Sequence, residues 1–413
     1  MASQPNDTLD GSMLSSITPA TPAGKPLPED HFSAAATTLD SLTTQAGDHA
    51  TPPKAHLHIP GHHDTAHSLF RSVFPYDSLT NFEAEWHLGN YVIDRGTGEK
   101  SFEPMSVYVR LGMHLLYYGS VQAKALQSHQ TQALLKAQSE KMGAQYDSPE
   151  SVAHIQPFIE SFELQGSLGE MVEPDPTKYA TFNAFFAREI KTSARPVAEP
   201  ENALAISSPA DCRLTAFPTT DAATRYWIKG FGFTMARLLG SEPSASTFDQ
   251  GSMVIARLAP QDYHRWHAPI SGRVESITEI PGTYYTVNPQ AINEAGTLDV
   301  FCENRRSVML VRPTSNPNSL VAIIAVGAML VGSIKYNPGI APGSEIQRGQ
   351  CLGAFYYGGS TVITLFPPGA AVLDEDLVAN STVDEADTAK NCETYVKVGW
   401  RVGQAVVQGA TVS

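Results

Sequence analysis

The chain is poor in positive charge and has no long apolar run. Its 413 residues include 28 Lys and Arg against 42 Asp and Glu, which gives a formal net charge of −14. Proteins that bind nucleic acid need a basic surface to neutralise phosphates, so this balance argues against a nucleic-acid partner. No stretch of about 18 apolar residues occurs, so the sequence predicts no transmembrane segment. Any contact with a membrane is expected to be peripheral.

Cysteine is also scarce. The four cysteines lie at positions 212, 302, 351 and 392, with no CxxC pair. This spacing does not match the disulfide framework of a small secreted domain and favours free thiols in a reducing compartment. The first residues lack both the apolar core of a secretory signal and the Arg-rich pattern of a mitochondrial presequence. We therefore expect a cytoplasmic protein.

Composition divides the chain into three parts. Residues 1–80 are rich in Ser, Thr, Pro and Ala with few large apolar groups, which predicts disorder. Residues 81–200 are predicted to be helical, with an apolar stripe from Val107 to Tyr118 that either packs on the rest of the protein or rests on a bilayer. Residues 201–413 contain short apolar runs between Gly, Pro and Asn, which is typical of β-structure. The expected class is α+β, a helical region followed by a β-rich catalytic domain.

A candidate self-cleavage site lies late in the chain. Tyr356-Tyr-Gly-Gly-Ser-Thr361 leads directly into the apolar run that ends at Phe366. Glycine tolerates strained backbone angles, and it leaves its carbonyl open to attack by the next side chain. The Ser360 hydroxyl can attack the carbonyl of Gly359, and elimination of the resulting ester would leave a pyruvoyl group. A Gly-Ser pair alone is more often a turn.

A second group of polar residues adds acid–base chemistry. His264 and His267 lie three residues apart, and Asp211 follows a turn-like Ser-Pro-Ala segment. Two close histidines can bind a metal, exchange protons or simply satisfy backbone groups. The neighbourhood offers no convincing third metal ligand, so no metal is expected. A serine, a histidine and an aspartate together are the parts of an activated nucleophile.

These segments resemble the phosphatidylserine decarboxylase family, in particular its eukaryotic branch with a Gly-Gly-Ser-Thr cleavage site. The resemblance covers residues 86–408 and keeps the order of the family's motifs. The resembling segments that precede the cleavage site are Tyr179–Ile190, Ala194–Pro196, Pro209–Asp211, Ala259–His267, Pro281–Pro289, Leu298–Asn304, Val326–Ile334 and Arg348–Gly353.

The resemblance implies a role for each matching residue. Ser360 would become the pyruvoyl cofactor, and Gly359 would end the larger of two subunits. His267 matches the histidine that activates the serine, and Asp211 matches the aspartate that orients it. His264 matches the histidine implicated in decarboxylation. The two fragments would form a heterodimer, and relatives also form homodimers.

Two further residues are candidates for substrate contact. Trp266 stands where the family usually has phenylalanine, and its larger ring is expected to form an aromatic wall. Arg306, or its neighbour Arg305, could pair with the phosphate of a phospholipid, although both could equally be surface arginines. Another departure from the family is Cys212, which follows Asp211 where glycine is common.

The expected activity is decarboxylation by a self-processed enzyme. The resemblance implies that phosphatidylserine forms a Schiff base with the pyruvoyl group and yields phosphatidylethanolamine and CO2. The alternative is a soluble decarboxylase of a free L-amino acid such as tryptophan, because soluble fungal members of the family that act on such substrates resemble this chain in the segment Tyr263–His267. A third hypothesis is an uncleaved scaffold, which the set of Asp211, His267, Gly359 and Ser360 argues against.

Overall fold

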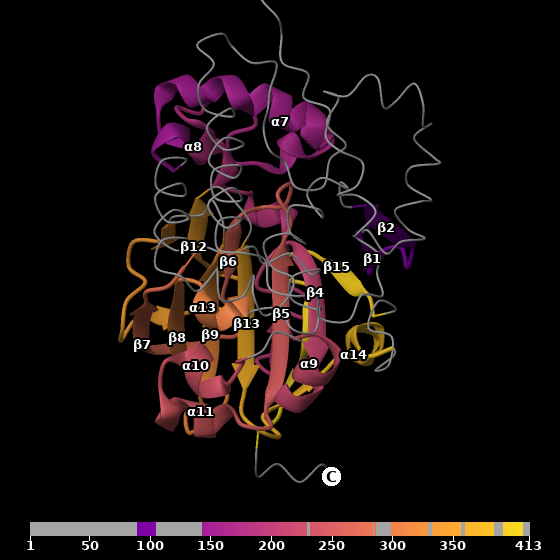
Figure 1. The fold of residues 1–413 in the computed structure, drawn as a ribbon, viewed down its shortest axis with the longest axis vertical. Helices are drawn as coiled ribbons and strands as arrows, with labels where there is room; N and C mark the ends of the chain where they lie inside the picture. Colours follow the sequence, from indigo (N-terminus) through magenta and orange to yellow (C-terminus); the bar gives the residue numbers. More distant parts are fainter. Residues whose placement is uncertain are drawn as a thin grey trace, which may run out of the picture.

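The structure is a computed structural model that describes residues 89–104, 143–228, 232–283, 285, 299–328, 333–356, 360–383 and 391–407. Figure 1 shows long strands through the centre, with α7 (Ile155–Ser161) and α8 (Phe182–Phe186) at one end of the molecule. No helix within these ranges is long and apolar enough to cross a membrane.

A ten-stranded sheet forms the framework. Its strand order is β11-β7-β8-β9-β13-β5-β4-β15-β1-β2, and the strands pair antiparallel except for β1 with β15. Strand β13 therefore lies in the interior of the sheet, between β5 and β9. In sheet order the bounds are Glu345–Ile346, Gly272–Ile280, Arg306–Pro313, Val321–Gly327, Ser360–Phe366, Ser252–Leu258, Cys212–Phe217, Glu393–Val396, Gly89–Asp94 and Lys100–Pro104.

Two three-stranded sheets pack against one face of this framework. One has the order β10 (Ser333–Tyr336), β12 (Cys351–Tyr356) and β6 (Arg265–His267). The other has the order β14 (Ala371–Leu373), β16 (Arg401–Ala405) and β3 (Ala205–Ser207). Their buried side chains form one apolar cluster with alternate residues of β5 and β13, because successive side chains of a strand point to opposite faces.

Short helices cover the opposite face. These are α9 (Thr220–Tyr226), α10 (Met235–Leu239), α11 (Glu242–Phe248) and α13 (Val300–Glu303), and they share an apolar cluster with the other alternate residues of β5 and β13. A Thr, Ser or Asp side chain caps the first turn of each helix by accepting a backbone N–H. One further helix, α14 (Glu375–Ser381), lies against β4.

A third apolar cluster holds the helices that precede the β-rich part. It includes residues of η1 (Pro149–His154), α7, η2 (Leu164–Glu170) and α8. Two shorter turns complete this part of the chain: η3 (Pro176–Lys178) lies between η2 and α8, and η4 (Thr192–Ala194) lies between α8 and β3. Phe158 of α7 is fully buried and contacts the rings of Phe182, Phe185 and Phe186 of α8 edge-on.

The α+β class is confirmed, but the predicted helical region begins differently. Residues 89–104 form the hairpin β1–β2, which adds to the edge of the main sheet. The Tyr91-Val92-Ile93 segment favours a strand, and the Asp94 side chain closes the turn by accepting the N–H groups of Gly96 and Thr97. The helical expectation was therefore wrong for this segment. The apolar stripe of residues 107–118 and the segment 1–80 lie outside the described residues.

Candidate active site

Ser360 is the first residue of β13 and lies in the middle of the main sheet. Its backbone is in register with Leu258 of β5 and Gly327 of β9. The side chain is fully buried, and its Oγ lies 3.2 Å from Nδ1 of His264. Gly359, the residue before the predicted cut, lies outside the described residues. The structure thus brings the predicted nucleophile together with one of the two predicted histidines.

The loop from Ala259 to His264 sets the proton positions on that histidine. Nε2 of His264 lies 3.0 Å from the carbonyl oxygen of Ala259, which can only accept, so Nε2 carries the hydrogen. Nδ1 therefore presents its lone pair to the Ser360 hydroxyl. Asp262 closes the loop, because its N–H donates to the Ala259 carbonyl and its Oδ2 accepts the Ala259 N–H at 2.7 Å.

The surroundings of His264 keep it neutral. The imidazole is buried and stacks on the Phe186 ring with 3.9 Å between ring centroids. Burial, together with the nearby positive charge of Arg188, lowers the pKa of His264 to about 3. At neutral pH the ring is therefore uncharged and able to accept a proton from Ser360.

Within the described residues, no hydrogen bond joins His267 to Asp211. His267 donates from Nδ1 to the Gly349 carbonyl at 2.8 Å, and Nε2 accepts from the Tyr263 hydroxyl at 3.3 Å. Both ring nitrogens thus have partners other than Asp211 and Ser360. Asp211 instead forms a two-pronged ion pair with Arg195, at 2.9 Å from Nε and 2.6 Å from Nη2. A guanidinium satisfies both oxygens of a buried carboxylate better than one imidazole N–H can.

The two predicted substrate contacts require correction. Trp266 is 1% exposed and packs in the apolar core beside Phe355 and Tyr336. Gly353 makes room for the indole, since a Cβ there would lie 2.4 Å from the Trp266 ring. Arg306 is buried too, and its guanidinium donates to backbone carbonyls, including that of Leu238 at 2.7 Å. Both side chains are structural in this fold.

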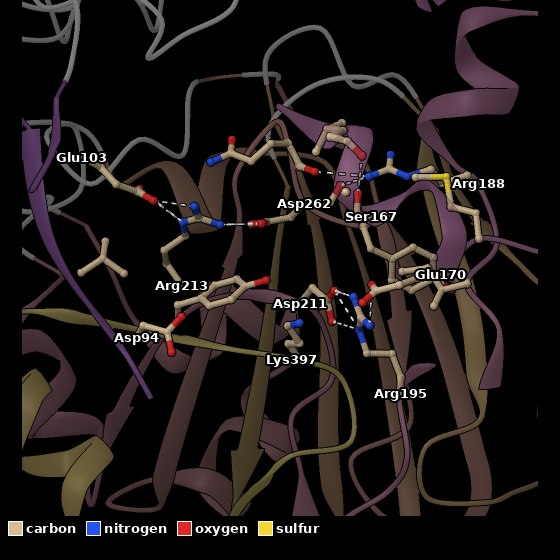
Figure 2. Close-up of a pocket in the computed structure, with 18 of the residues that line it drawn as sticks. Asp94, Glu103, Ser167, Glu170, Arg188, Arg195, Asp211, Arg213, Asp262 and Lys397 are labelled. Atoms are coloured by element: carbon tan, nitrogen blue, oxygen red, sulfur yellow. Dashed lines mark hydrogen bonds and ion pairs between the residues drawn. The ribbon is translucent and has the colours of Figure 1, made fainter. Parts of the chain in front are cut away.

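A cavity of about 390 Å³, lined by several charged residues, borders the loop that leads to His264 (Figure 2). Its walls come from β1, β2, β4, β15, η2 and residues 261–263 of that loop. Arg213 lies between Glu103 and Asp262, with 2.6 Å from Nη1 to Oδ2 of Asp262. These charged residues were not singled out from the sequence. Isolated charges in different segments give no local signal, because only the folded sheet brings them together.

Comparison with known proteins identifies the family. Residues 182–404 match the family described as phosphatidylserine decarboxylase. The chain is 44% identical over 315 residues to phosphatidylserine decarboxylase proenzyme 3 of Schizosaccharomyces pombe, covering 76% of this chain and 31% of that protein. It is 41% identical over 312 residues to proenzyme 2 of Oryza sativa, covering 76% of this chain and 48% of the relative.

A bacterial relative matches over nearly its whole length. The phosphatidylserine decarboxylase proenzyme of Fusobacterium nucleatum is 32% identical over 311 residues, which cover 75% of this chain and 96% of that protein. By contrast, the matches span less than half the length of the fungal and plant relatives. A match to more than half of this chain, with an ordered set of motifs around a buried serine, shows that the chain belongs to the phosphatidylserine decarboxylase family.

Proposed function

We propose that the chain cuts itself between Gly359 and Ser360 and then acts as a pyruvoyl-dependent decarboxylase of phosphatidylserine. The observation that carries the proposal is the buried Ser360 hydroxyl, hydrogen-bonded to a neutral His264 at the family's cleavage sequence. The products would be phosphatidylethanolamine and CO2. The names of the relatives support this substrate, since each is called a phosphatidylserine decarboxylase proenzyme.

The cleavage chemistry needs a nucleophile and a base. Ser360 Oγ attacks the carbonyl carbon of Gly359, the C–N bond breaks, and the acyl group moves to oxygen while the nitrogen takes up a proton. Removal of the Cα proton of residue 360 then breaks the Cβ–Oγ bond, so that Gly359 leaves as a carboxylate that keeps this oxygen. Addition of one water to the resulting dehydroalanine would release ammonia and leave a pyruvoyl group at residue 360. That group supplies an electron sink for the loss of CO2.

The roles of the two histidines form part of the proposal. The resemblance assigns activation of Ser360 to His267, oriented by Asp211, and assigns the decarboxylation step to His264. The 3.2 Å contact supports the second assignment, because His264 lies at the residue from which the pyruvoyl group would derive. The first assignment requires His267 to leave Gly349 and Tyr263, and it rests on the resemblance alone.

The relatives favour the phospholipid over a free amino acid, since those compared are phosphatidylserine decarboxylase proenzymes. Trp266, whose indole could have stacked on an aromatic amino-acid substrate, lies in the apolar core. The free amino acid therefore remains only as an outcome of the activity assay.

The test of self-cleavage is a denaturing gel with mass spectrometry. Purified wild-type protein should give two fragments, and the one that begins at residue 360 should have a blocked N-terminus. Ser360→Ala should stay a single chain without activity, because alanine has no oxygen for the acyl shift. Ser344→Ala is the matched control, since Ser344 also follows a glycine but lies in an exposed turn, and it should cleave normally. Uncleaved wild-type protein that releases CO2 from phosphatidylserine would contradict the proposal.

A further inference from the structure

Arg188 is a buried cation that forms no ion pair with the acidic residues the structure describes. It is 4% exposed and lines the cavity of Figure 2, where its guanidinium extends toward Asp262 and Ser167. Its Nη2 donates to the carbonyls of Gln261 at 3.2 Å and Asp262 at 3.3 Å. Its Nε has no hydrogen-bond partner in the described part of the chain. A buried N–H group of this kind is costly unless another molecule accepts it.

The other arginines of the cavity are already neutralised. Arg195 pairs with Asp211 and Glu170, and Arg213 pairs with Glu103 and Asp262. Lys397 also lines the cavity, and the ion pairs found among the described residues do not include it. Arg188 and Lys397 are therefore the two cations of this wall that are available to an incoming anion.

The cavity is close to the proposed reaction centre. Arg188 donates hydrogen bonds to the backbone carbonyls of Gln261 and Asp262, in the loop that carries His264. Its positive charge also contributes to the lowered pKa of His264. Phe186, two residues before Arg188, stacks on the His264 ring. An anion bound at Arg188 would thus lie one short loop away from Ser360.

We propose that Arg188, assisted by Lys397, binds the phosphodiester of the substrate in this cavity. The inference rests on the proposed function, which supplies a substrate with both a carboxylate and a phosphodiester. The phosphodiester keeps its charge throughout the reaction, so its contact with a guanidinium anchors the substrate equally in the ground and transition states. The carboxylate loses its charge as CO2 leaves, and a guanidinium there would stabilise the reactant and slow the reaction. A free amino acid offers no phosphodiester for this site.

The experiment measures binding separately from turnover. The probe is glycerophosphoethanolamine, titrated by calorimetry into the purified full chain, with ethanolamine as the phosphate-free comparison. Arg188→Gln should weaken binding of the probe at least tenfold, and Arg188→Lys should have a smaller effect because it keeps the charge but not the fork. Arg312→Gln, which removes an exposed arginine outside the cavity, is the matched control and should bind like wild type.

Kinetics separate a binding role from a structural one. Arg188→Gln should raise KM for phosphatidylserine with little change in kcat, as expected for loss of uniform binding. A residue that only braces the His264 loop would lower kcat or self-cleavage and leave probe affinity unchanged, which would overturn the proposal. If Arg188→Gln does not fold, the affinities of Arg188→Lys and Lys397→Met for the probe test the proposed site instead. Wild-type probe affinity in both variants would also overturn the proposal.

Failure of the site and failure of the function give different results. If wild-type protein binds the probe through Arg188 but releases no CO2 from phosphatidylserine, the proposed function is wrong and the anion site stands. If the protein turns over phosphatidylserine and Arg188→Gln keeps the wild-type KM and probe affinity, the site is wrong and the function stands.

Discussion

The carbonyl of Ala259 decides what His264 can do. By accepting the Nε2 hydrogen, it leaves Nδ1 as the acceptor that faces Ser360. Burial against Phe186 then keeps the ring neutral, at the cost of making it a weak base. A neutral, weakly basic imidazole can take up and return a proton at a buried centre, but it does not stay charged there.

Substitution of each histidine separates cleavage from turnover. We expect His264→Ala to yield cleaved protein whose kcat falls at least a hundredfold, the usual loss when a proton-transfer group is removed. His267→Ala is expected to remain uncleaved, as the resemblance implies. Gel densitometry and CO2 release on the same samples check both outcomes. Cleavage that is lost in His264→Ala and retained in His267→Ala would instead assign activation of Ser360 to the residue that contacts it.

Cys351 is predicted to be a reactive thiol. Burial opposes its ionisation, but the hydrogen bond with His267 and the charge of Arg265 outweigh burial and lower the pKa of the Cys351 thiol to about 7. The side chain is partly exposed, whereas Cys212, Cys302 and Cys392 are buried. Because the thiolate is the nucleophile, alkylation of Cys351 should rise as pH increases through about 7.

Mass spectrometry after brief treatment with iodoacetamide between pH 5 and 9 checks this prediction. Burial raises the pKa of the Cys212 thiol, so that cysteine is the internal control and should stay unmodified in folded protein. His267→Ala should move the reactivity of Cys351 to higher pH. A profile for Cys351 that is still rising steeply at pH 9 in wild type would contradict the predicted ionisation.

At the scale of elements, the hairpin β1–β2 is tied to the active-site loop through charge. Glu103 of β2 pairs with Arg213 of β4, which also pairs with Asp262 of the loop that carries His264. Arg213 is buried between the two carboxylates, and Arg257 also lies 3.8 Å from Glu103. An edge hairpin far away in the sequence thus contributes to the position of the proposed catalytic loop.

Removal of Arg213 should be strongly destabilising. Arg213→Met removes the ion-pair partner of the buried Asp262 carboxylate and leaves Glu103 only the longer contact with Arg257, at 3.8 Å. Loss of one partner of a buried pair typically costs about 3–5 kcal/mol of unfolding free energy. Arg312→Met removes an arginine from an exposed pair with Glu275 and should cost less than about 1 kcal/mol. Urea unfolding followed by circular dichroism measures both. Equal stabilities of the two variants would show that the buried network contributes little.

The sequence predicts some elements better than others, for local reasons. The alternating apolar runs after residue 201 predict strands because each strand buries at least one face in a local pattern. The cleavage serine is recognisable because its signal lies within six neighbouring residues. The sequence does not predict which side chain faces Ser360. His264 precedes β6, and within β6 the side chains of Trp266 and His267 point to opposite sides of the strand. That choice depends on strand pairing between distant segments.

At the scale of the whole molecule, cleavage before Ser360 would not separate the fragments. The second fragment would supply β13 in the interior of the main sheet, β15 between β4 and β1, and β14 and β16 in a smaller sheet. Strand β13 alone pairs with β5 and β9 along its length and buries every residue. The backbone hydrogen bonds and apolar burial of the folded chain would therefore hold the two fragments as one unit.

Net charge sets how such a unit meets its proposed substrate. The chain carries −14, and vesicles of phosphatidylserine are also anionic, so long-range electrostatics oppose their encounter. Raising the salt from about 0.01 M to about 0.1 M shortens the screening length from roughly 30 Å to roughly 10 Å. We therefore expect CO2 release from phosphatidylserine vesicles to hold steady or increase over this range.

The same lipid diluted into neutral detergent micelles is the control, and its CO2 release should depend less on salt. A tenfold fall in CO2 release from vesicles as the salt concentration rises would mean that a local basic surface outside the described residues governs binding. If the protein releases CO2 from a free amino acid but from neither lipid form, that amino acid replaces phosphatidylserine as the proposed substrate.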